Sequence, residues 1–123
     1  MLLRLRRLFI PQIPPSLLHA WCHEQVNVQI LDVRTPEEYA AGHLAGSLLI
    51  PLQELKQRLA EVPRGVRIIA LCHAGVRSAQ ATRLLLLEGI DVVNLQGGIV
   101  RWQQEGFAVE QLPKNRHERR ETL

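Results

Sequence analysis

The sequence predicts an α/β domain built on an open, mainly parallel sheet with helices on both faces. Three observations support this prediction. Short apolar runs rich in β-branched residues alternate along the chain with segments of helical periodicity. Turn signals containing glycine or proline separate these segments. The 123 residues, of which 46% are hydrophobic, suffice to bury the core of one soluble domain but not of two.

The first half of the chain is predicted to hold a helix, a strand, a helix and a strand. Ser16 follows a proline-rich entry and is expected to cap a short helix whose apolar residues recur every three to four positions. The apolar run VQILDV at 28–33 predicts a buried strand. Thr35 then caps a helix that stops at Gly42. Residues 47–50 predict a second strand.

The second half is predicted to hold three helices and two strands. Leucines at helical spacing cover residues 52–59, and VRIIAL at 66–71 predicts a third strand. Residues 79–88 are a strong helix-forming run that ends at a glycine. A fourth strand follows at 91–95. The glycine pair at 97–98 permits a turn and close backbone approach before the last helix.

The positive charge gathers at the two ends of the chain. Three arginines near the N-terminus contribute +3 and the segment from Lys114 onward contributes +2, so the body between them carries −2 of the net +3. A nucleic-acid interface is expected to combine basic and aromatic side chains on the folded surface. Since only 4% of the residues are aromatic, we predict no nucleic-acid partner.

Composition divides the chain into three parts. Residues 1–12 form a basic and apolar arm, residues 13–108 form the domain, and residues 109–123 form a polar tail that is expected to be disordered. Arginines interrupt the apolar residues of the arm, and no small-residue cleavage site follows, so a signal peptide is not indicated. No apolar stretch approaches the roughly 20 residues of a membrane span. These features predict a cytoplasmic domain without a membrane span.

One of the two cysteines is a candidate nucleophile. Cys22 and Cys72 stand far apart and outside any pattern of disulfides or zinc ligands, so we expect a reducing compartment, no metal site and no cofactor. Cys72 lies between the third strand and a helix, at the edge of the sheet where parallel α/β proteins bind ligands. Cys22 has no such setting, and the sequence assigns it no chemistry.

The segment CHAGVRS, from Cys72 to Ser78, has the features of an anion-binding loop. Gly75 tolerates unusual backbone angles, so that successive N–H groups can face inward as a ring. The positive end of the following helix and the guanidinium of Arg77 both favour a thiolate over a thiol. We interpret Ser78 as the helix cap rather than as a catalytic hydroxyl.

Three segments resemble the signature blocks of single-domain rhodaneses, the thiosulfate sulfurtransferases. They are LDVRTPEEYAAGHLAGSLLIP at 31–51, CHAGVRSAQA at 72–81 and NLQGGIVRWQQEG at 94–106. The resemblance extends over about residues 13–106, and three blocks in the right order are more specific than one motif. It implies a rhodanese-like fold and a sulfurtransferase in which Cys72 becomes a persulfide.

The resemblance implies a two-step displacement with ping-pong kinetics. The Cys72 thiolate would take the outer sulfur of a small anionic donor, thiosulfate or glutathione persulfide, and pass it to a thiol or a protein cysteine. Arg77 would pair with the charge of the sulfur or of the donor. Backbone N–H groups of the loop would bind the terminal sulfur, and they belong to His73, Ala74, Gly75, Val76 and Arg77.

Asp32 and Arg34, at the end of the first strand, receive their roles from the same resemblance. Asp32 would support the active loop, and Arg34 would bring positive charge to the entrance and help to bind the substrate. A structural ion pair is the other interpretation of Arg34. His43 is interpreted as a hydrogen-bonded structural histidine. His73 replaces the Arg or Lys of many relatives and is only partly charged near neutral pH, which favours a persulfide or protein donor.

Two other functions remain open at this stage. Phosphatases and arsenate reductases related to the cell-cycle phosphatases have one more residue between the cysteine and the arginine, which widens the loop for a tetrahedral oxyanion. The spacing from Cys72 to Arg77 is the short form. The main alternative is a protein-to-protein sulfur-relay or interaction module with little activity on small molecules, and the basic ends of the chain could bind its partner.

Overall fold

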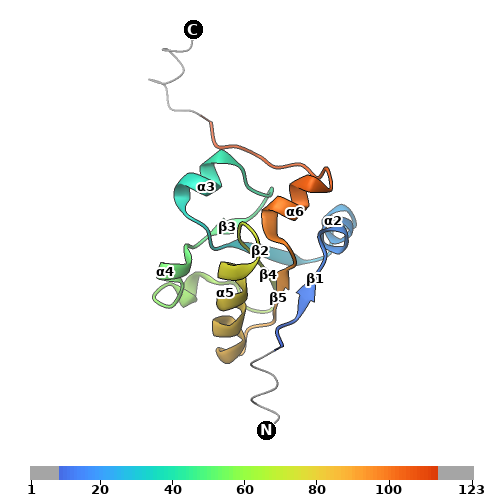
Figure 1. Ribbon diagram of the computed structural model, residues 1–123. Helices are drawn as coiled ribbons and strands as arrows, with labels where there is room; N and C mark the ends of the chain where they lie inside the picture. Colours follow the sequence, from blue (N-terminus) through green and yellow to red (C-terminus); the bar gives the residue numbers. More distant parts are fainter. Residues whose placement is uncertain (1–8, 114–123) are drawn as a thin grey trace.

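The computed structural model describes residues 9–113, which form a sheet surrounded by helices (Figure 1). The elements along the chain are β1 (Gln12–Ile13), α2 (Pro15–His23), β2 (Val28–Asp32), α3 (Pro36–Ala41), β3 (Leu48–Leu49), α4 (Leu52–Leu55), the 3-10 helix η1 (Leu59–Glu61), β4 (Arg67–Leu71), α5 (Val76–Leu87), β5 (Val92–Leu95) and α6 (Gly98–Gln104). Strands and helices alternate, as the sequence predicts.

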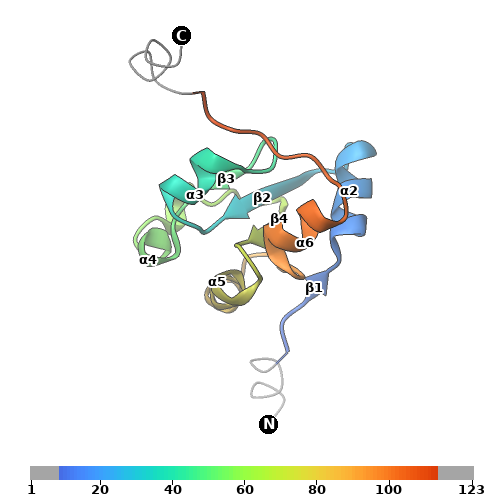
Figure 2. The ribbon, with the colours of Figure 1, turned by 45° about the horizontal axis from the view of Figure 1, so that its top comes forward.

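The five strands form one sheet in the order β1-β5-β4-β2-β3, and every strand pair is parallel (Figure 2). This confirms the predicted α/β fold. The chain leaves β2 toward β3 and leaves β4 toward β5, in opposite directions along the sheet. Such a reversal is the place where open α/β sheets bind ligands. Asp32 and Leu71 are paired at this point, so the loops after β2 and β4 start side by side.

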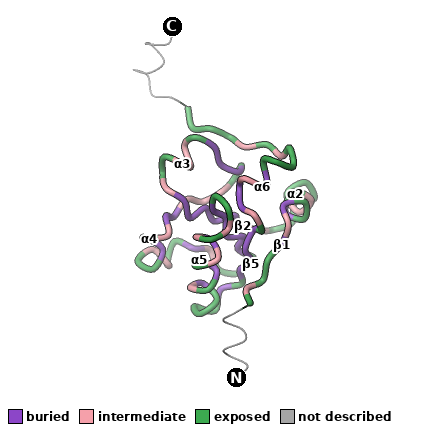
Figure 3. Tube along the Cα trace, viewed as in Figure 1, coloured by how far each residue is buried: buried purple, intermediate pink, exposed green. Residues whose placement is uncertain are grey.

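Two hydrophobic clusters lie on opposite faces of the sheet. Along β4 and the residue after it, Ile68, Ala70 and Cys72 belong to one cluster, whereas Ile69 and Leu71 belong to the other. This alternation is that of a strand buried on both faces. Burial is concentrated along the central strands (Figure 3). Each fully buried aliphatic side chain contributes about 1.5–3 kcal/mol to stability, so the clusters hold the ends of β2 and β4 in place.

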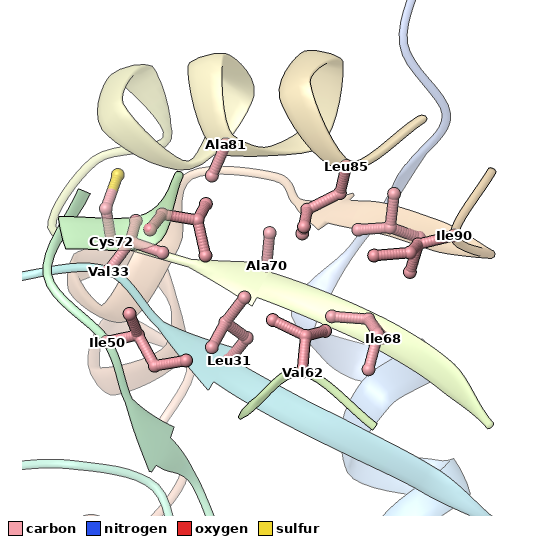
Figure 4. Close-up of a cluster of buried hydrophobic side chains, with 12 residues drawn as sticks. Leu31, Val33, Ile50, Val62, Ile68, Ala70, Cys72, Ala81, Leu85 and Ile90 are labelled. Carbon is pink, nitrogen blue, oxygen red and sulfur yellow. The ribbon is translucent and has the colours of Figure 1, made fainter. Parts of the chain in front are cut away.

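Helices cover both clusters. On one face Leu55 of α4 and Leu85 of α5 are fully buried, and Figure 4 shows Ala81 and Leu85 projecting from α5 toward Ala70. On the other face α2 packs against α6, through Leu18 and other apolar side chains. The predicted arrangement of helices on both faces is therefore confirmed.

The two predicted helix caps have different outcomes. Thr35 caps α3 in a full capping box, in which its hydroxyl accepts from the Glu38 N–H and the Glu38 carboxylate accepts from the Thr35 N–H, at 3.2 and 3.1 Å. The prediction for Ser16 is wrong, because α2 begins two residues earlier than a cap at Ser16 requires. Pro14 is its N-cap and Pro15 its first residue, a position that suits the fixed φ and missing N–H of proline.

Two further expectations differ from the structure. The predicted helix over 52–59 is divided into α4 and η1, with a turn between them. Strand β1 was not predicted, because its two residues stand between prolines and show no alternation. It pairs with β5 at the edge of the sheet.

The segment after α6 packs along the domain. Residues 109–113, assigned to the tail by composition, are described, and Glu110 forms an antiparallel bridge with His43. Leu112 donates its N–H to the carbonyl of Ala40 at 3.1 Å. The rest of the predicted arm and tail, residues 1–8 and 114–123 with their basic side chains, lies outside the described residues. Between residues 9 and 113, no helix combines the length and the apolarity that crossing a membrane requires.

Candidate active site

Cys72 follows β4 directly and is only 1% exposed. Its sulfur lies beside the first turn of α5 (Figure 4). The Sγ atom accepts hydrogen bonds from the Gly75 N–H at 3.0 Å and from the Ser78 hydroxyl at 3.2 Å. Two donors, one from the loop backbone and one from α5, therefore hold the Cys72 sulfur in place at the start of the helix.

Ser78 is not the helix cap that the sequence predicted. Gly75 is the N-cap of α5, with a left-handed φ of 104°, and no side chain caps the helix. The helix therefore begins earlier than expected, and Ser78 lies inside its first turn, fully buried. A hydroxyl at this position points to the Cys72 sulfur. The conformational freedom expected of Gly75 is confirmed by its φ.

The loop between β4 and α5 is fixed by the N-terminus of α6. The N–H groups of Ile99 and Val100 donate to the carbonyls of Cys72 and His73, at 2.9 and 3.1 Å. The C=O and N–H of one peptide unit point in opposite directions. Since the carbonyls of Cys72 and His73 face α6, the N–H groups of His73 and Ala74, which belong to the same peptide units, face away from α6. A Cβ on Gly98 would lie 2.3 Å from the His73 oxygen, so the predicted close backbone approach of the glycine pair is confirmed.

Asn94 is a site residue that the sequence analysis missed. It is 2% exposed on β5, and its Nδ2 lies 3.4 Å from the Gly75 carbonyl and 3.4 Å from Gln12 Oε1. Its Oδ1 is buried without a hydrogen-bond partner among the described residues. The signal was available, since Asn94 is the one polar residue in the buried run VVNL. Its amide supports the loop from the sheet side.

Arg77 is engaged by an acidic residue from another helix. Its two terminal nitrogens donate to the two carboxylate oxygens of Glu38 on α3, at 2.7 and 2.8 Å. These bonds, then the hydrogen bond from the Thr35 N–H and the charge of Arg77, outweigh desolvation and lower the pKa of Glu38 to about 2. The pKa of Arg77 is raised, first by the hydrogen bonds to Glu38, and also by the nearby charges of Glu38, Cys72 and Asp32. The ion pair ties the first turn of α5 to α3.

The sequence analysis assigned no role to Glu38. The capping box of Thr35 and Glu38, three residues apart, was the signal that could have singled it out. The partner on α5 could not be read from the sequence, because it lies 39 positions away.

Asp32 and Arg34 form a buried ion pair at the end of β2. Arg34 is 4% exposed, and its Nη2 lies 2.7 Å from Asp32 Oδ2. It also donates to the carbonyls of Glu38 and Gly42, which close the end of α3. A structural ion pair was one of the two interpretations of Arg34 from the sequence, and the structure shows this pair with Asp32. Through Arg34, Asp32 positions α3 and with it Glu38.

The remaining loop residues form an exposed rim without Arg, Lys, Asp or Glu. His73 and Ala74 are exposed, and Val76 is 72% exposed at the start of α5. The structure therefore brings Cys72 together with the whole loop that the sequence predicted.

His43 lies in a structural position. Its ring stacks on Tyr39 at 3.9 Å, and Nδ1 is 2.8 Å from the Tyr39 carbonyl. It packs next to Glu110, with 3.9 Å between Nε2 and the carboxylate. These contacts agree with the interpretation of His43 as a hydrogen-bonded structural residue.

Cys22 is remote from this site. It lines a cavity of about 290 Å³ with His19, His23 and Trp102, on the sheet face opposite to Cys72. Partial burial raises the pKa of the Cys22 thiol, which opposes thiolate formation. The two cysteines thus differ in their surroundings, since the Cys72 sulfur accepts two hydrogen bonds at the end of β4 and Cys22 lies on the other face of the sheet.

The Ser78→Ala variant is expected to make Cys72 less reactive by about tenfold, because one donor to the thiolate is lost. The rate of alkylation by iodoacetamide near neutral pH measures this. Ser47→Ala is the matched control, since the Ser47 hydroxyl donates to the Leu44 carbonyl and not to the sulfur. Equal alkylation rates in both variants would refute the role of Ser78.

The Glu38→Gln variant is expected to change the acid stability of the protein. The lowered pKa of Glu38 means that its carboxylate stabilises the fold above about pH 4.5, the ordinary value, and that this contribution disappears as the pH falls to about 2. Because the pair is partly exposed, we expect about 1 kcal/mol near neutral pH. Urea unfolding across this range should show the wild type and the variant converging toward acid pH. A difference that does not depend on pH would contradict the assignment.

Comparison with known proteins decides the family. The Rhodanese-like domain family matches residues 15–105, which include every element from α2 to α6. The chain belongs to the rhodanese family.

Relatives of this rhodanese-like chain carry sulfurtransferase names. It is 34% identical over 84 residues to a sulfurtransferase of Allochromatium vinosum, covering 68% of this chain and 78% of that protein. It is 39% identical over 71 residues to a thiosulfate sulfurtransferase of Escherichia coli, covering 56% and 68%. It spans only 24% to 60% of three further curated relatives. The two relatives with sulfurtransferase names support a sulfurtransferase-type enzyme.

Solved structures confirm the rhodanese fold. The crystal structure of a rhodanese-like domain protein from Staphylococcus aureus superposes with a TM-score of 0.77 at 35% identity, covering 85% of this chain and all of that one. A rhodanese-related protein from Thermoplasma volcanium gives the same TM-score at 32% identity, covering 81% and 97%.

Proposed function

We propose that this rhodanese moves a sulfane sulfur from thiosulfate or a persulfide donor to a thiophilic acceptor through a persulfide on Cys72. The observation that carries the proposal is the environment of the Cys72 sulfur. It lies at the reversal point of the sheet and accepts hydrogen bonds from Gly75 and Ser78. This is the setting of an activated cysteine nucleophile.

In the first step the Cys72 thiolate attacks the outer sulfur of the donor. A new S–S bond forms while the bond between the outer sulfur and the rest of the donor breaks, with its electron pair. The leaving group is sulfite when the donor is thiosulfate, and a thiolate when the donor is an organic hydropersulfide. Cys72 then carries a persulfide, and charge is conserved without an external oxidant.

In the second step an acceptor nucleophile attacks the terminal sulfur and regenerates the Cys72 thiolate. Cyanide yields thiocyanate, and a thiol or a protein cysteine yields a new persulfide. The other N–H groups of the loop, between His73 and Arg77, bind the terminal sulfur. Gly75 and Ser78 stabilise the Cys72 sulfur as the leaving group.

Arg77, Asp32 and Arg34 have positioning roles in this proposal. Arg77 ties α5 to α3, and the Asp32–Arg34 pair anchors the end of α3. A reducing compartment keeps the Cys72 thiol free to act as the nucleophile, so we assign the reaction to the cytoplasm.

Two-substrate kinetics test the proposal. With thiosulfate and cyanide varied together, ping-pong transfer predicts parallel double-reciprocal lines, because sulfite leaves before cyanide binds. Intersecting lines would contradict a persulfide intermediate. Absence of transfer together with hydrolysis of a phosphate ester would favour the phosphatase alternative.

A second candidate function is a sulfur relay between proteins. The exposed Val76 and Ala74 beside the buried sulfur favour it, because an uncharged rim suits contact with another protein. Fast transfer from a protein persulfide, with negligible turnover of small donors, would support this candidate.

A further inference from the structure

Both arginines that the site motifs bring to the active edge are already paired. Arg77 makes two hydrogen bonds to Glu38, and Arg34 is bound to Asp32 at 2.7 Å. Each pair sums to zero charge. The positive charge of each guanidinium is therefore already compensated before a donor anion arrives.

Glu38 is fixed in this arrangement from two sides. Its Oε1 also accepts from the N–H and the hydroxyl of Thr35, at 3.1 and 3.2 Å. Turning away from Arg77 would break the capping box of α3 as well as the ion pair. The lowered pKa of Glu38 keeps the carboxylate charged throughout the neutral range, so Arg77 stays compensated.

The negative charge of a sulfur donor is then met mainly by backbone dipoles. The loop N–H groups and the N-terminus of α5 supply partial charges, equivalent to about half a unit charge for a helix terminus. The exposed rim of His73, Ala74 and Val76 adds no permanent cation. Because the desolvation cost of an ion rises with the square of its charge, a dianion costs about four times as much as a monoanion of equal size.

We propose that Glu38 is a specificity-determining residue, which by engaging Arg77 selects donors with one negative charge at the reacting end over the thiosulfate dianion. The favoured donors are organic persulfides and organic thiosulfonates. This inference rests on the proposed function, since it concerns the loading of Cys72.

Two donors of similar shape isolate the effect of charge. Thiosulfate carries two negative charges, and methanethiosulfonate, in which a methyl group replaces one oxygen, carries one. The Cys72 thiolate takes the outer sulfur from either. Sulfite leaves in the first case and methanesulfinate in the second, each with the electron pair of the broken S–S bond.

The test compares loading rates of the wild type, Glu38→Gln and Glu37→Gln by time-resolved intact mass. Glu37 is the matched control, because it lies on α3, is exposed, and makes none of the hydrogen bonds to Arg77. The rate ratio of methanethiosulfonate to thiosulfate is expected to fall about fivefold in Glu38→Gln and to stay unchanged in Glu37→Gln. Comparing ratios between variants removes the intrinsic reactivity of the donors.

A second variant tests the effect of charge without changing the capping box of α3, which Glu38→Gln also alters. His73→Arg adds a cation at an exposed loop position and is expected to lower the same ratio, whereas Gln80→Arg, exposed on α5, adds the same charge outside the loop. Normal loading with the same ratio in all variants would overturn the role of Glu38 and leave the proposed function standing. Failure of both donors to load Cys72 in every variant would overturn the proposed function and this inference with it.

Discussion

The Cys72→Ser variant is expected to lose sulfur transfer by at least about a thousandfold, because the attacking thiolate and the persulfide intermediate both require sulfur. A serine hydroxyl stays protonated near neutral pH and cannot form a persulfide. The variant should fold normally, since serine is close in size and can accept the hydrogen bonds from Gly75 and Ser78. Thiocyanate production from thiosulfate and cyanide measures the loss.

Cys22→Ser is the control for this prediction. Cys22 lies on the opposite face of the sheet and is exposed, so its replacement should leave both turnover and stability near the wild-type values. If Cys22→Ser abolished turnover while Cys72→Ser retained it, the assignment of the nucleophile would be reversed.

The Gly98→Ala variant is expected to show the second large effect, on stability and activity together. The new methyl group would overlap the carbonyls of His73 and Cys72, at 2.3 and 2.6 Å, and the φ of +61° is unfavourable for alanine. We expect a loss of about 2–4 kcal/mol in the free energy of unfolding. Because the overlap displaces the loop that surrounds the sulfur, loading of Cys72 should slow by about a hundredfold.

Gly106→Ala separates backbone strain from overlap. Gly106 also has a positive φ, of +84°, but a Cβ there would meet no atom within 4 Å. The Gly106→Ala variant should lose only about 1 kcal/mol in the free energy of unfolding, and its Cys72 should load sulfur at the normal rate. Equal losses of stability and loading in the two variants would show that the contact between α6 and the loop does not position Cys72. Urea unfolding and intact mass give both readouts.

The fold could be predicted because its signals are local. The apolar runs around Leu31 and Ile69, the capping Thr35 and the Gly75 turn each act within a few residues, and the parallel sheet follows from their alternation. The two-residue β1 could not be predicted, since its place depends on pairing with β5 and not on its own pattern.

The site was predictable in its position and less so in its contacts. Cys72 at a strand end, before a glycine and a helix, is a local pattern. The Arg77–Glu38 pair and the support from Asn94 join segments far apart in the chain, and no local pattern encodes them. Ser78 was misassigned because Gly75 starts the helix early, which moves the hydroxyl from a cap position to the sulfur.

The most direct test of the account is the intact mass of the reduced protein after incubation with thiosulfate and, separately, with glutathione persulfide. The account predicts the addition of one sulfur atom that cyanide removes, in the wild type and in Cys22→Ser but not in Cys72→Ser. Failure of both donors to add sulfur, or addition that persists in Cys72→Ser, would contradict the persulfide on Cys72.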